Sequence, residues 1–347
     1  MVIPHSRPLI DEEDIKAVAE VLASGHIAQG ERVKEFENAI ANFVGVKHAV
    51  ACSSGTAAIH LALNSLGVKK GDEVIMPSYV CSSLYFATLY VGAKPVIADI
   101  DISDLNISTK SVRGLISAKT KAIIVPHMFG IPAEIDEFLK LEIPIIEDCA
   151  QSLGAEYKGR RVGSFGDLAI FSFYATKMIT TGEGGMVITN SNDLYSKINE
   201  IRDYDKKPLT PVKYNYKMTD FQAALGISQF KKLPRFIKRR REIATLYDKK
   251  LSNYNVKLFS IPHYKEPVFY RYVVMVNDAE SIQKRAKENG VTFEKPVHKP
   301  LHKSLNASEC PNSDEAYEKA LSIPIYPSLR EEELSYIISA FDKIFAE

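Results

Sequence analysis

Two residue types in this sequence, a lysine and an aspartate, occur in settings that suit covalent cofactor chemistry. Lys177 follows an apolar run at 168–173 and precedes a segment at 182–185 with three glycines, and Asp148 ends the apolar run that begins at 143. A lysine amine forms a Schiff base with an aldehyde, and a carboxylate can keep a pyridine nitrogen protonated. The pair therefore indicates pyridoxal phosphate (PLP) chemistry. Spacing alone leaves a solvated lysine as an equal alternative.

The first half of the chain predicts the elements that must position these residues. Short, β-branched apolar runs alternate with helical patterns, which is typical of an α/β fold with a mostly parallel sheet buried on both faces. The expected strands are 49–52, 73–76, 95–100, 122–125, 144–147, 169–173 and 185–189, and expected helices include 56–66, 82–91 and 135–140.

Asp148 has a predictable direction in such a sheet. Ligands bind beyond the carboxyl ends of parallel strands, and Asp148 stands at such an end. Because side chains alternate along a strand, we expect Glu147 to point to the opposite face. The common alternative for Asp148 is an acid that only caps the following loop.

The segment S-S-G-T-A-A at 53–58 is a candidate phosphate site. It follows an expected strand and opens a helix, so backbone N–H groups and the helix dipole converge on one point. Gly55 permits close approach, and Thr56 adds a hydroxyl. An ordinary serine or glycine helix cap explains the same letters equally well.

The second half of the chain changes to longer helices. Thr219 is expected to cap a helix that runs to Phe230, and Pro234 to start a second helix. A smaller α/β unit follows, with a strand at 270–276, a helix at 279–289 and a closing helix at 331–345. We expect a large domain at 1–250 and a small domain at 251–347.

Composition excludes several classes of function. The 347 residues include 44 basic and 43 acidic ones, which argues against a nucleic-acid binder. We find neither an apolar run of about 20 residues, as a membrane span needs, nor a secretory signal at the first residues. Four scattered cysteines predict reduced cytoplasmic thiols rather than a disulfide framework or metal site. The seven cations at 231–241 are interpreted as a solvated helix face, with a funnel for an anionic substrate as the alternative.

Several motifs, in order, resemble those of the DegT/DnrJ/StrS family of sugar aminotransferases. The segments at 145–151 (I-I-E-D-C-A-Q) and 170–186 are similar to the family's E-D-A-A-Q and F-S-F-x-x-x-K-x-x-x-x-G-E-G-G, and the likeness extends from I-P-H-S-R-P at 3–8 to P-I-Y-P-S at 324–328. The resemblance implies PLP fold type I, with the helix at 12–23 at the active-site rim or with the small domain. It makes Lys177 the catalytic lysine.

The resemblance also implies roles for residues that would carry none alone. Gln151 would lie near the phenolic oxygen of the cofactor, and Ser172, like Gly55 and Thr56, near its phosphate. Asn215 would bind the phosphate across a homodimer interface, and Lys217 replaces the family's commoner arginine, keeping the charge without bidentate geometry. His298 would lie near the sugar-nucleotide pocket, although a lone histidine is more often structural.

Three positions depart from the family pattern. The sequence has R-D-Y-D at 202–205 instead of R-x-H-G, Tyr174 where histidine is frequent, and Cys81 where an aromatic ring commonly covers the cofactor. We expect Tyr79 or Tyr85 to supply the missing ring. These departures concern the substrate rather than the central chemistry.

The resemblance implies a PLP-dependent aminotransferase. It would pass through a pyridoxamine phosphate form and move an amino group from glutamate to a nucleotide-linked 3- or 4-keto-6-deoxy sugar, in amino-sugar or polysaccharide biosynthesis. A dehydratase on the same fold is the first alternative, which Lys177 disfavours, and a non-catalytic sensor is the second. An NAD-linked oxidoreductase is set aside because no G-x-G-x-x-G follows the first expected strand.

Overall fold

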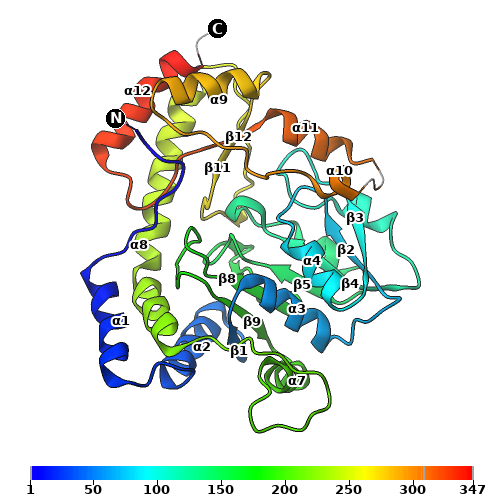
Figure 1. The fold of residues 1–347 in the computed structure, drawn as a ribbon. Coiled ribbons are helices and arrows are strands. Elements are labelled where there is room, and N and C mark those ends of the chain that lie inside the picture. The colour runs from blue at the N-terminus through cyan, green and yellow to red at the C-terminus, as the bar shows by residue number, and fades with distance from the viewer. Residues whose placement is uncertain (1, 306, 308, 346–347) are drawn as a thin grey trace.

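A seven-stranded sheet forms the centre of the computed structural model, which describes residues 2–305, 307 and 309–345 (Figure 1). The strand order is β1-β9-β8-β5-β4-β2-β3, and β9 alone is antiparallel to its neighbours β1 and β8. The strands are β1 (His48–Cys52), β2 (Glu73–Pro77), β3 (Lys94–Ala98), β4 (Thr120–Pro126), β5 (Ile145–Asp148), β8 (Leu168–Ser172) and β9 (Gly185–Thr189). The expected α/β class and all seven strands are confirmed.

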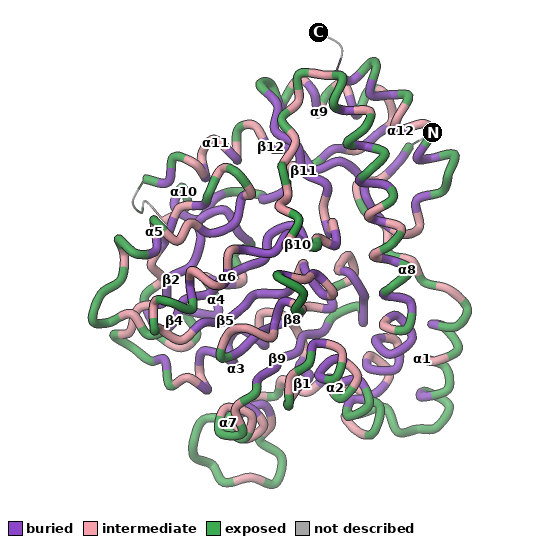
Figure 2. Tube along the Cα trace, turned by 180° about the vertical axis from the view of Figure 1, so that it is seen from behind, coloured by how far each residue is buried: buried purple, intermediate pink, exposed green. Residues whose placement is uncertain are grey.

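Helices cover both faces of this sheet, so most residues of its strands are buried (Figure 2). In β4, Ile123 and Val125 join one hydrophobic core while Ala122 and Ile124 join the other. Burial on both faces explains why the strands appear as continuous apolar runs. The helices of this part are α2 (Glu31–Val44), α3 (Gly55–Ser65), α4 (Ser83–Tyr90), α5 (Thr109–Arg113), α6 (Ile135–Leu139) and α7 (Asn192–Arg202), with a 3-10 turn at Met128–Gly130.

A second, smaller sheet pairs β11 (Tyr272–Met275) with β12 (Ala320–Ile323) in antiparallel fashion. Its core also contains Ile3 and Tyr247, so the N-terminal segment and the end of a long helix belong to the same packing unit. The remaining elements are α1 (Glu12–Ser24), β6 (Glu156–Tyr157), β7 (Arg160–Arg161), β10 (Lys265–Glu266), α9 (Ala279–Glu288), α10 (Leu301–Leu305), α11 (Pro311–Lys319) and α12 (Glu331–Ile344).

The predicted break at Pro234 is wrong, because a single helix, α8, runs from Asp220 to Leu251 with Pro234 inside it. Its 32 residues make it about 48 Å long, and it connects the lower and upper parts of the molecule in Figure 1. Proline deprives the Phe230 carbonyl of its helical partner. The buried side chains of Leu233 and Phe236 on either side of Pro234 hold the helix against the core all the same. The predicted start of this helix is confirmed, because Thr219 forms a capping box there.

The interpretation of residues 231–241 as a solvated face is wrong for Lys232 and Arg240, which are both buried. Lys232 forms ion pairs with Asp11 and Asp14 of the α1 start at 2.6 and 2.7 Å. Arg240 donates to three backbone carbonyls of the smaller part. This helix therefore uses cations to fasten the N-terminal segment and the smaller sheet to itself. No helix within the described ranges is long and apolar enough to cross a membrane.

Candidate active site

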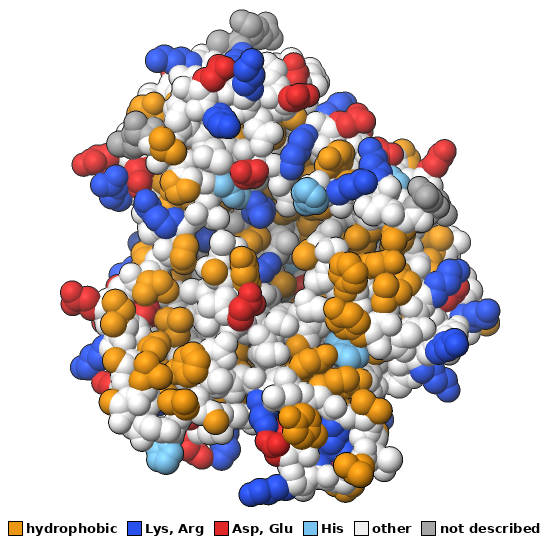
Figure 3. Space-filling model, viewed as in Figure 1, with side chains coloured by type: hydrophobic (Ala, Val, Ile, Leu, Met, Phe, Trp, Pro, Cys, Tyr) orange, Lys and Arg blue, Asp and Glu red, His pale blue; other side chains and the backbone are white. Residues whose placement is uncertain are grey.

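A cavity of about 230 Å³ lies at the carboxyl ends of β1, β4, β5 and β8. Figure 3 shows the face on which the molecule is hollowed between its upper and lower parts. The topology places the loops after β4, β5 and β8 side by side, and only β9 separates them from the loop after β1. Six of the residues predicted from sequence line this cavity, namely Gly55, Thr56, Asp148, Gln151, Ser172 and Lys177.

The start of α3 forms a narrow cradle on one side of the cavity. Ser54 caps the helix by accepting a hydrogen bond from the Ala57 N–H at 3.1 Å. A Cβ atom at Gly55 would lie only 2.9 Å from Cβ of Ser172, so no larger residue fits without displacement. The N–H groups of Gly55 and Thr56 have no acceptor within the helix and are available to an anion. The helix cap and the phosphate site foreseen as alternatives are therefore compatible.

Asp148 is a buried carboxylate that faces the cavity with 7% of its surface exposed. Its Oδ1 accepts one hydrogen bond from the Ala150 N–H at 2.9 Å. Burial raises the pKa of Asp148 above its usual value, although Ala150, Lys177 and His127 act in the opposite direction. A cation brought into the cavity would stabilise the ionised form of this carboxylate. The protonated ring nitrogen of PLP is a cation of this kind.

Glu147 points away from the cavity, as strand alternation predicts, and is fully buried. Its carboxylate accepts four hydrogen bonds. The donors are His127 Nε2 at 3.0 Å and the backbone N–H groups of Gly163, Phe165 and Gly166 at 2.7–2.8 Å. Burial raises the pKa of Glu147, but these hydrogen bonds outweigh it and hold the pKa below its usual value. Glu147 is therefore ionised and fastens the segment between β7 and β8 to β5.

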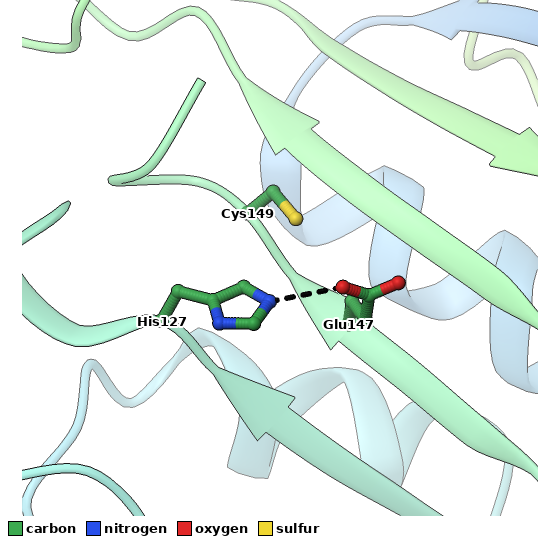
Figure 4. A group of neighbouring side chains, drawn as sticks. All are labelled: His127, Glu147 and Cys149. Carbon is green, nitrogen blue, oxygen red and sulfur yellow. Dashed lines mark hydrogen bonds and ion pairs between the residues drawn. The ribbon is translucent and has the colours of Figure 1, made fainter. Parts of the chain in front are cut away.

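His127 has a defined tautomer in this cluster. Its Nδ1 accepts a hydrogen bond from the Ala133 N–H at 3.0 Å, so Nε2 carries the hydrogen that is donated to Glu147 (Figure 4). The Cys149 thiol lies beside the pair, and the three ligand-type atoms lie within 4.8 Å of one another. Because backbone donors already occupy both oxygens of Glu147, the hydrogen bonds alone account for this cluster.

Gln151 is oriented by the backbone beside it. The Phe129 N–H, which can only donate, lies 2.8 Å from Oε1 of Gln151, so this oxygen must be the acceptor. Phe129 adopts the left-handed conformation with φ of 60°, which turns its N–H toward the glutamine. The Gln151 amide nitrogen therefore remains a donor for a group in the cavity.

Lys177 lies in the turn after β8, and its ammonium nitrogen is 5.0 Å from the centre of the Tyr270 ring. The Tyr270 hydroxyl is 3.4 Å from the Thr176 hydroxyl. Burial raises the pKa of Tyr270, but the cations Lys177 and Arg271 outweigh it and lower the pKa. Sequence reasoning assigned Tyr270 only to a strand, because its approach to Lys177 depends on how the smaller sheet packs.

A second, smaller cavity of about 30 Å³ adjoins the first at Lys177. Its walls come from residues 5–9, the turn after β8, α8, the segment just before β11 and residues 322–327. Sequence analysis noted the motifs at 3–8 and 324–328 without a role, and Arg7 and Tyr326 from these motifs contact each other in this wall. His5 and Arg271, which also line it, were not foreseen as site residues.

Three residues predicted for the site do not line the cavity of this single chain. Asn215 and His298 are exposed. Lys217 forms ion pairs with Asp203 at 3.1 Å and with Asp205. The cofactor and substrate contacts foreseen for these three residues stay predictions.

The expectation that Tyr79 or Tyr85 covers the cavity is wrong. Tyr79 is fully buried and donates a hydrogen bond to the Ala316 carbonyl at 3.3 Å, and neither tyrosine is among the described residues that line the cavity. Cys81, which is exposed, and Tyr174 line it instead. The sequence alone does not show whether Tyr79 or Cys81 faces the cavity, because the turn after β2 decides which side chain points inward.

Comparison with known proteins agrees with the motifs. The model of the DegT/DnrJ/EryC1/StrS aminotransferase family matches residues 8–342. The chain belongs to this family. The resemblance stated from the motifs at 145–151 and 170–186 is thereby confirmed, and with it the aminotransferase class.

Family members with known names and structures cover the chain from end to end. GDP-perosamine synthase of Escherichia coli O157:H7 is 32% identical over 99% of each chain. PseC of Helicobacter pylori, an aminotransferase involved in the biosynthesis of pseudoaminic acid, has a TM-score of 0.93 and 28% identity, and the match covers 99% of both chains. Spr1654 of Streptococcus pneumoniae, solved in a PLP form, has a TM-score of 0.93, 28% identity and coverage of 99% and 98%.

Proposed function

We propose that this protein is a PLP-dependent aminotransferase that transfers an amino group from glutamate to a nucleotide-linked keto sugar. The observation that carries the proposal is the convergence of Lys177 and Asp148 on one cavity beside the α3 cradle. GDP-perosamine synthase and PseC, which match the chain over nearly its whole length, support a sugar substrate. The 3- or 4-keto-6-deoxy class of sugar, and a role in amino-sugar or polysaccharide biosynthesis, follow from this likeness.

The residues present fit PLP, which has been seen in a family member solved in PLP and PMP forms. Asp148 would bind the protonated pyridine nitrogen, and Gly55, Thr56 and Ser172 would bind the phosphate. Gln151, whose amide nitrogen has no hydrogen-bond partner among the described residues, would donate to the phenolic oxygen. When bound, PLP supplies a carbonyl carbon for attachment of the amine and a ring that accepts the electrons of the broken C–H bond.

Lys177 would attach the cofactor and then move protons. Once released, its neutral amine can take the proton from the α-carbon of the amino donor and later deliver a proton to the sugar carbon that receives nitrogen. The Tyr270 ring lies beside this amine, with its centre 5.0 Å from the Lys177 nitrogen, and the charges of Lys177 and Arg271 lower the pKa of its hydroxyl despite burial. Retention of this lysine supports transamination over dehydration.

We further propose a homodimer with shared active sites. Asn215 is exposed on the segment that precedes α8, where it is available to a neighbouring protomer. Apolar side chains on α4 are exposed as well, and Figure 3 shows apolar side chains gathered over this helix; they are Phe86, Leu89 and Tyr90. Asn215 of one protomer would then bind the cofactor phosphate in the other, while Lys217 and His298 would contact the substrate.

A cytoplasmic location is part of the same proposal. All four cysteines are free thiols, which suits a reducing compartment. A large domain at 1–250 and a small domain at 251–347 would form the two sides of the active-site hollow.

The stoichiometry of the reaction tests the proposal. Purified protein, glutamate and a panel of nucleotide-linked keto sugars should produce one 2-oxoglutarate for each amino sugar formed. Loss of water from the sugar without incorporation of nitrogen would favour the dehydratase alternative. A protein that accepts nitrogen from no donor, judged by an unchanged visible spectrum, would favour the sensor.

A further inference from the structure

The small cavity beside Lys177 is lined by several cations and by no acidic side chain among the described residues. Lys177, Arg7, Arg240 and Arg271 line it, and none of the described residues in its wall is an aspartate or a glutamate. An enclosed wall with several cations and no carboxylate is a favourable environment for an anion.

Two of these cations have internal partners. Arg7 forms an ion pair with Glu333 at 2.9 Å. Arg240 donates from one nitrogen to the carbonyls of Phe269, Tyr270 and Ile325 at 2.7–3.1 Å, and so holds the backbone in place. Both arginines are therefore explained by the structure of the smaller part.

Arg271 differs, because no carboxylate in the described ranges forms an ion pair with it. Its Nη1 donates to Nε2 of His5 at 3.2 Å. Burial and the charge of Arg271 lower the pKa of His5 to about 3, so His5 is neutral near pH 7 and does not balance the charge. Arg271 is only half-buried, so its remaining donors can turn toward a ligand.

The Tyr270 ring connects Arg271 with Lys177. Lys177 Nζ lies 5.0 Å from the ring centre and the Arg271 guanidinium carbon lies 5.5 Å from it. The two cations therefore share one aromatic neighbour, and both line the same small cavity.

We propose that Arg271 binds a carboxylate group of the amino donor. The inference rests on the proposed function, since it assumes an amino-acid donor. This cavity is narrow, at about 30 Å³, and adjoins the larger cavity at Lys177, so it suits the end of a molecule held in the larger cavity rather than a whole substrate. The carboxylate of an amino acid is attached to the carbon that reacts, so it must lie next to Lys177, and guanidinium donors match its geometry.

Two other pairings are less favourable. A sugar diphosphate is separated from the reacting carbon by the sugar ring, and it suits the larger cavity of about 230 Å³ better. Lys217 is the other candidate cation, but its ammonium group already pairs with Asp203 and Asp205. Arg271 is therefore the cation that the structure leaves for the donor.

Binding of glutarate, a dicarboxylate without an amine, tests the inference on the PLP-loaded protein. We expect Arg271→Met to weaken glutarate binding in calorimetry about 10- to 100-fold, as for loss of a charged hydrogen bond. Arg271→Lys should give an intermediate loss. Arg113→Met is the matched control, because Arg113 is exposed, pairs with Glu137 and lines neither cavity; it should leave the dissociation constant unchanged.

A second measurement separates the donor from the sugar. In the pyridoxamine phosphate form no donor is needed, so Arg271→Met should aminate the keto sugar at the wild-type rate in a single turnover. An unchanged glutarate affinity with weakened nucleotide-sugar binding would overturn the inference in favour of the diphosphate. A thermal midpoint and visible cofactor spectrum like those of the wild type establish that the variant is folded. If instead the wild type takes nitrogen from no donor, the proposed function fails, and glutarate binding still decides whether Arg271 holds a carboxylate.

Discussion

The ammonium nitrogen of Lys177 lies 5.0 Å from the centre of the Tyr270 ring, although the two residues flank strands of different sheets. The turn after β8 carries the lysine, and the segment before β11 carries the tyrosine. Packing of the smaller sheet against the larger one thus completes the surroundings of the lysine. A substitution of Lys177 or of Tyr270 can therefore show whether this contact affects catalysis or the stability of the fold.

Lys177→Ala should abolish covalent attachment of the cofactor. Without the amine no reducible bond forms, so borohydride treatment should leave no cofactor mass on the protein. Activity should fall by about a thousandfold or more, because a proton-transfer group is lost as well. Lys197→Ala is the control, since Lys197 is exposed and forms an ion pair with the exposed Asp193. Labelling of another lysine in Lys177→Ala would refute the assignment.

Asp148→Asn should separate cofactor binding from stability. In the loaded enzyme we expect weaker PLP binding and turnover lower by on the order of a hundredfold or more. In the cofactor-free protein, by contrast, we expect the substitution to stabilise the folded state near pH 7. Burial raises the pKa of Asp148, so the folded state binds more protons than the unfolded state above the usual aspartate range, and stability falls as the pH rises through that window.

The measurement for Asp148 is the thermal midpoint of the cofactor-free protein against pH. Asp148→Asn should exceed the wild type at pH 7, and the difference should vanish below about pH 3, where the carboxyl is protonated in both states. Equal midpoints at all pH values, together with near-normal turnover, would contradict both roles.

Glu147→Gln should destabilise the protein by about 3–5 kcal/mol at pH 7, as for breaking a buried charged network. The low pKa of Glu147 contributes stability above the usual glutamate pKa, and this stability is lost as the pH falls through the lowered value. Chemical denaturation at pH 7 and at pH 4 measures the difference, which should shrink at the lower pH. Glu137→Gln removes an exposed carboxylate paired with Lys140 and should change stability by no more than about 0.5 kcal/mol.

Gly55→Ala should weaken cofactor binding, because its Cβ would meet Cβ of Ser172 at 2.9 Å and widen the cradle. We expect the PLP dissociation constant to rise by about 5- to 150-fold, which corresponds to about 1–3 kcal/mol. Gly114→Ala is a matched control, since its Cβ would lie 3.6 Å from the nearest atom, the Ser111 carbonyl oxygen. Fluorescence titration measures the PLP affinity of both variants. Equal affinities would exclude a role of the α3 cradle in binding the cofactor.

Mixing two inactive variants tests the shared site. Lys177→Ala and an Asn215→Ala variant should regain part of the activity when combined, because one site of the hybrid dimer keeps both residues. Size-exclusion chromatography should show a dimer for each. Full activity of a monomer at micromolar concentration would disprove this arrangement.

The local pattern predicted most of the large sheet, because strands buried on both faces leave an unbroken apolar trace. It failed at Pro234, since the rule that proline ends a helix describes an isolated segment. In α8 the buried neighbours Leu233 and Phe236 keep the helix continuous. The boundary between domains at residue 250 stays a prediction, and α8, which packs into both parts, shows why the sequence contains no linker there.

The sequence by itself determined the family, the strand-end position of Asp148 and the turn that carries Lys177, because each depends on neighbours within a few residues. Tertiary structure alone decided which side chains surround that lysine. Arg271, Tyr270 and His5 come from segments whose approach depends on α8 and on the packing of the smaller sheet. Long-range packing is set by the sum of many weak apolar contacts, so no short motif encodes it.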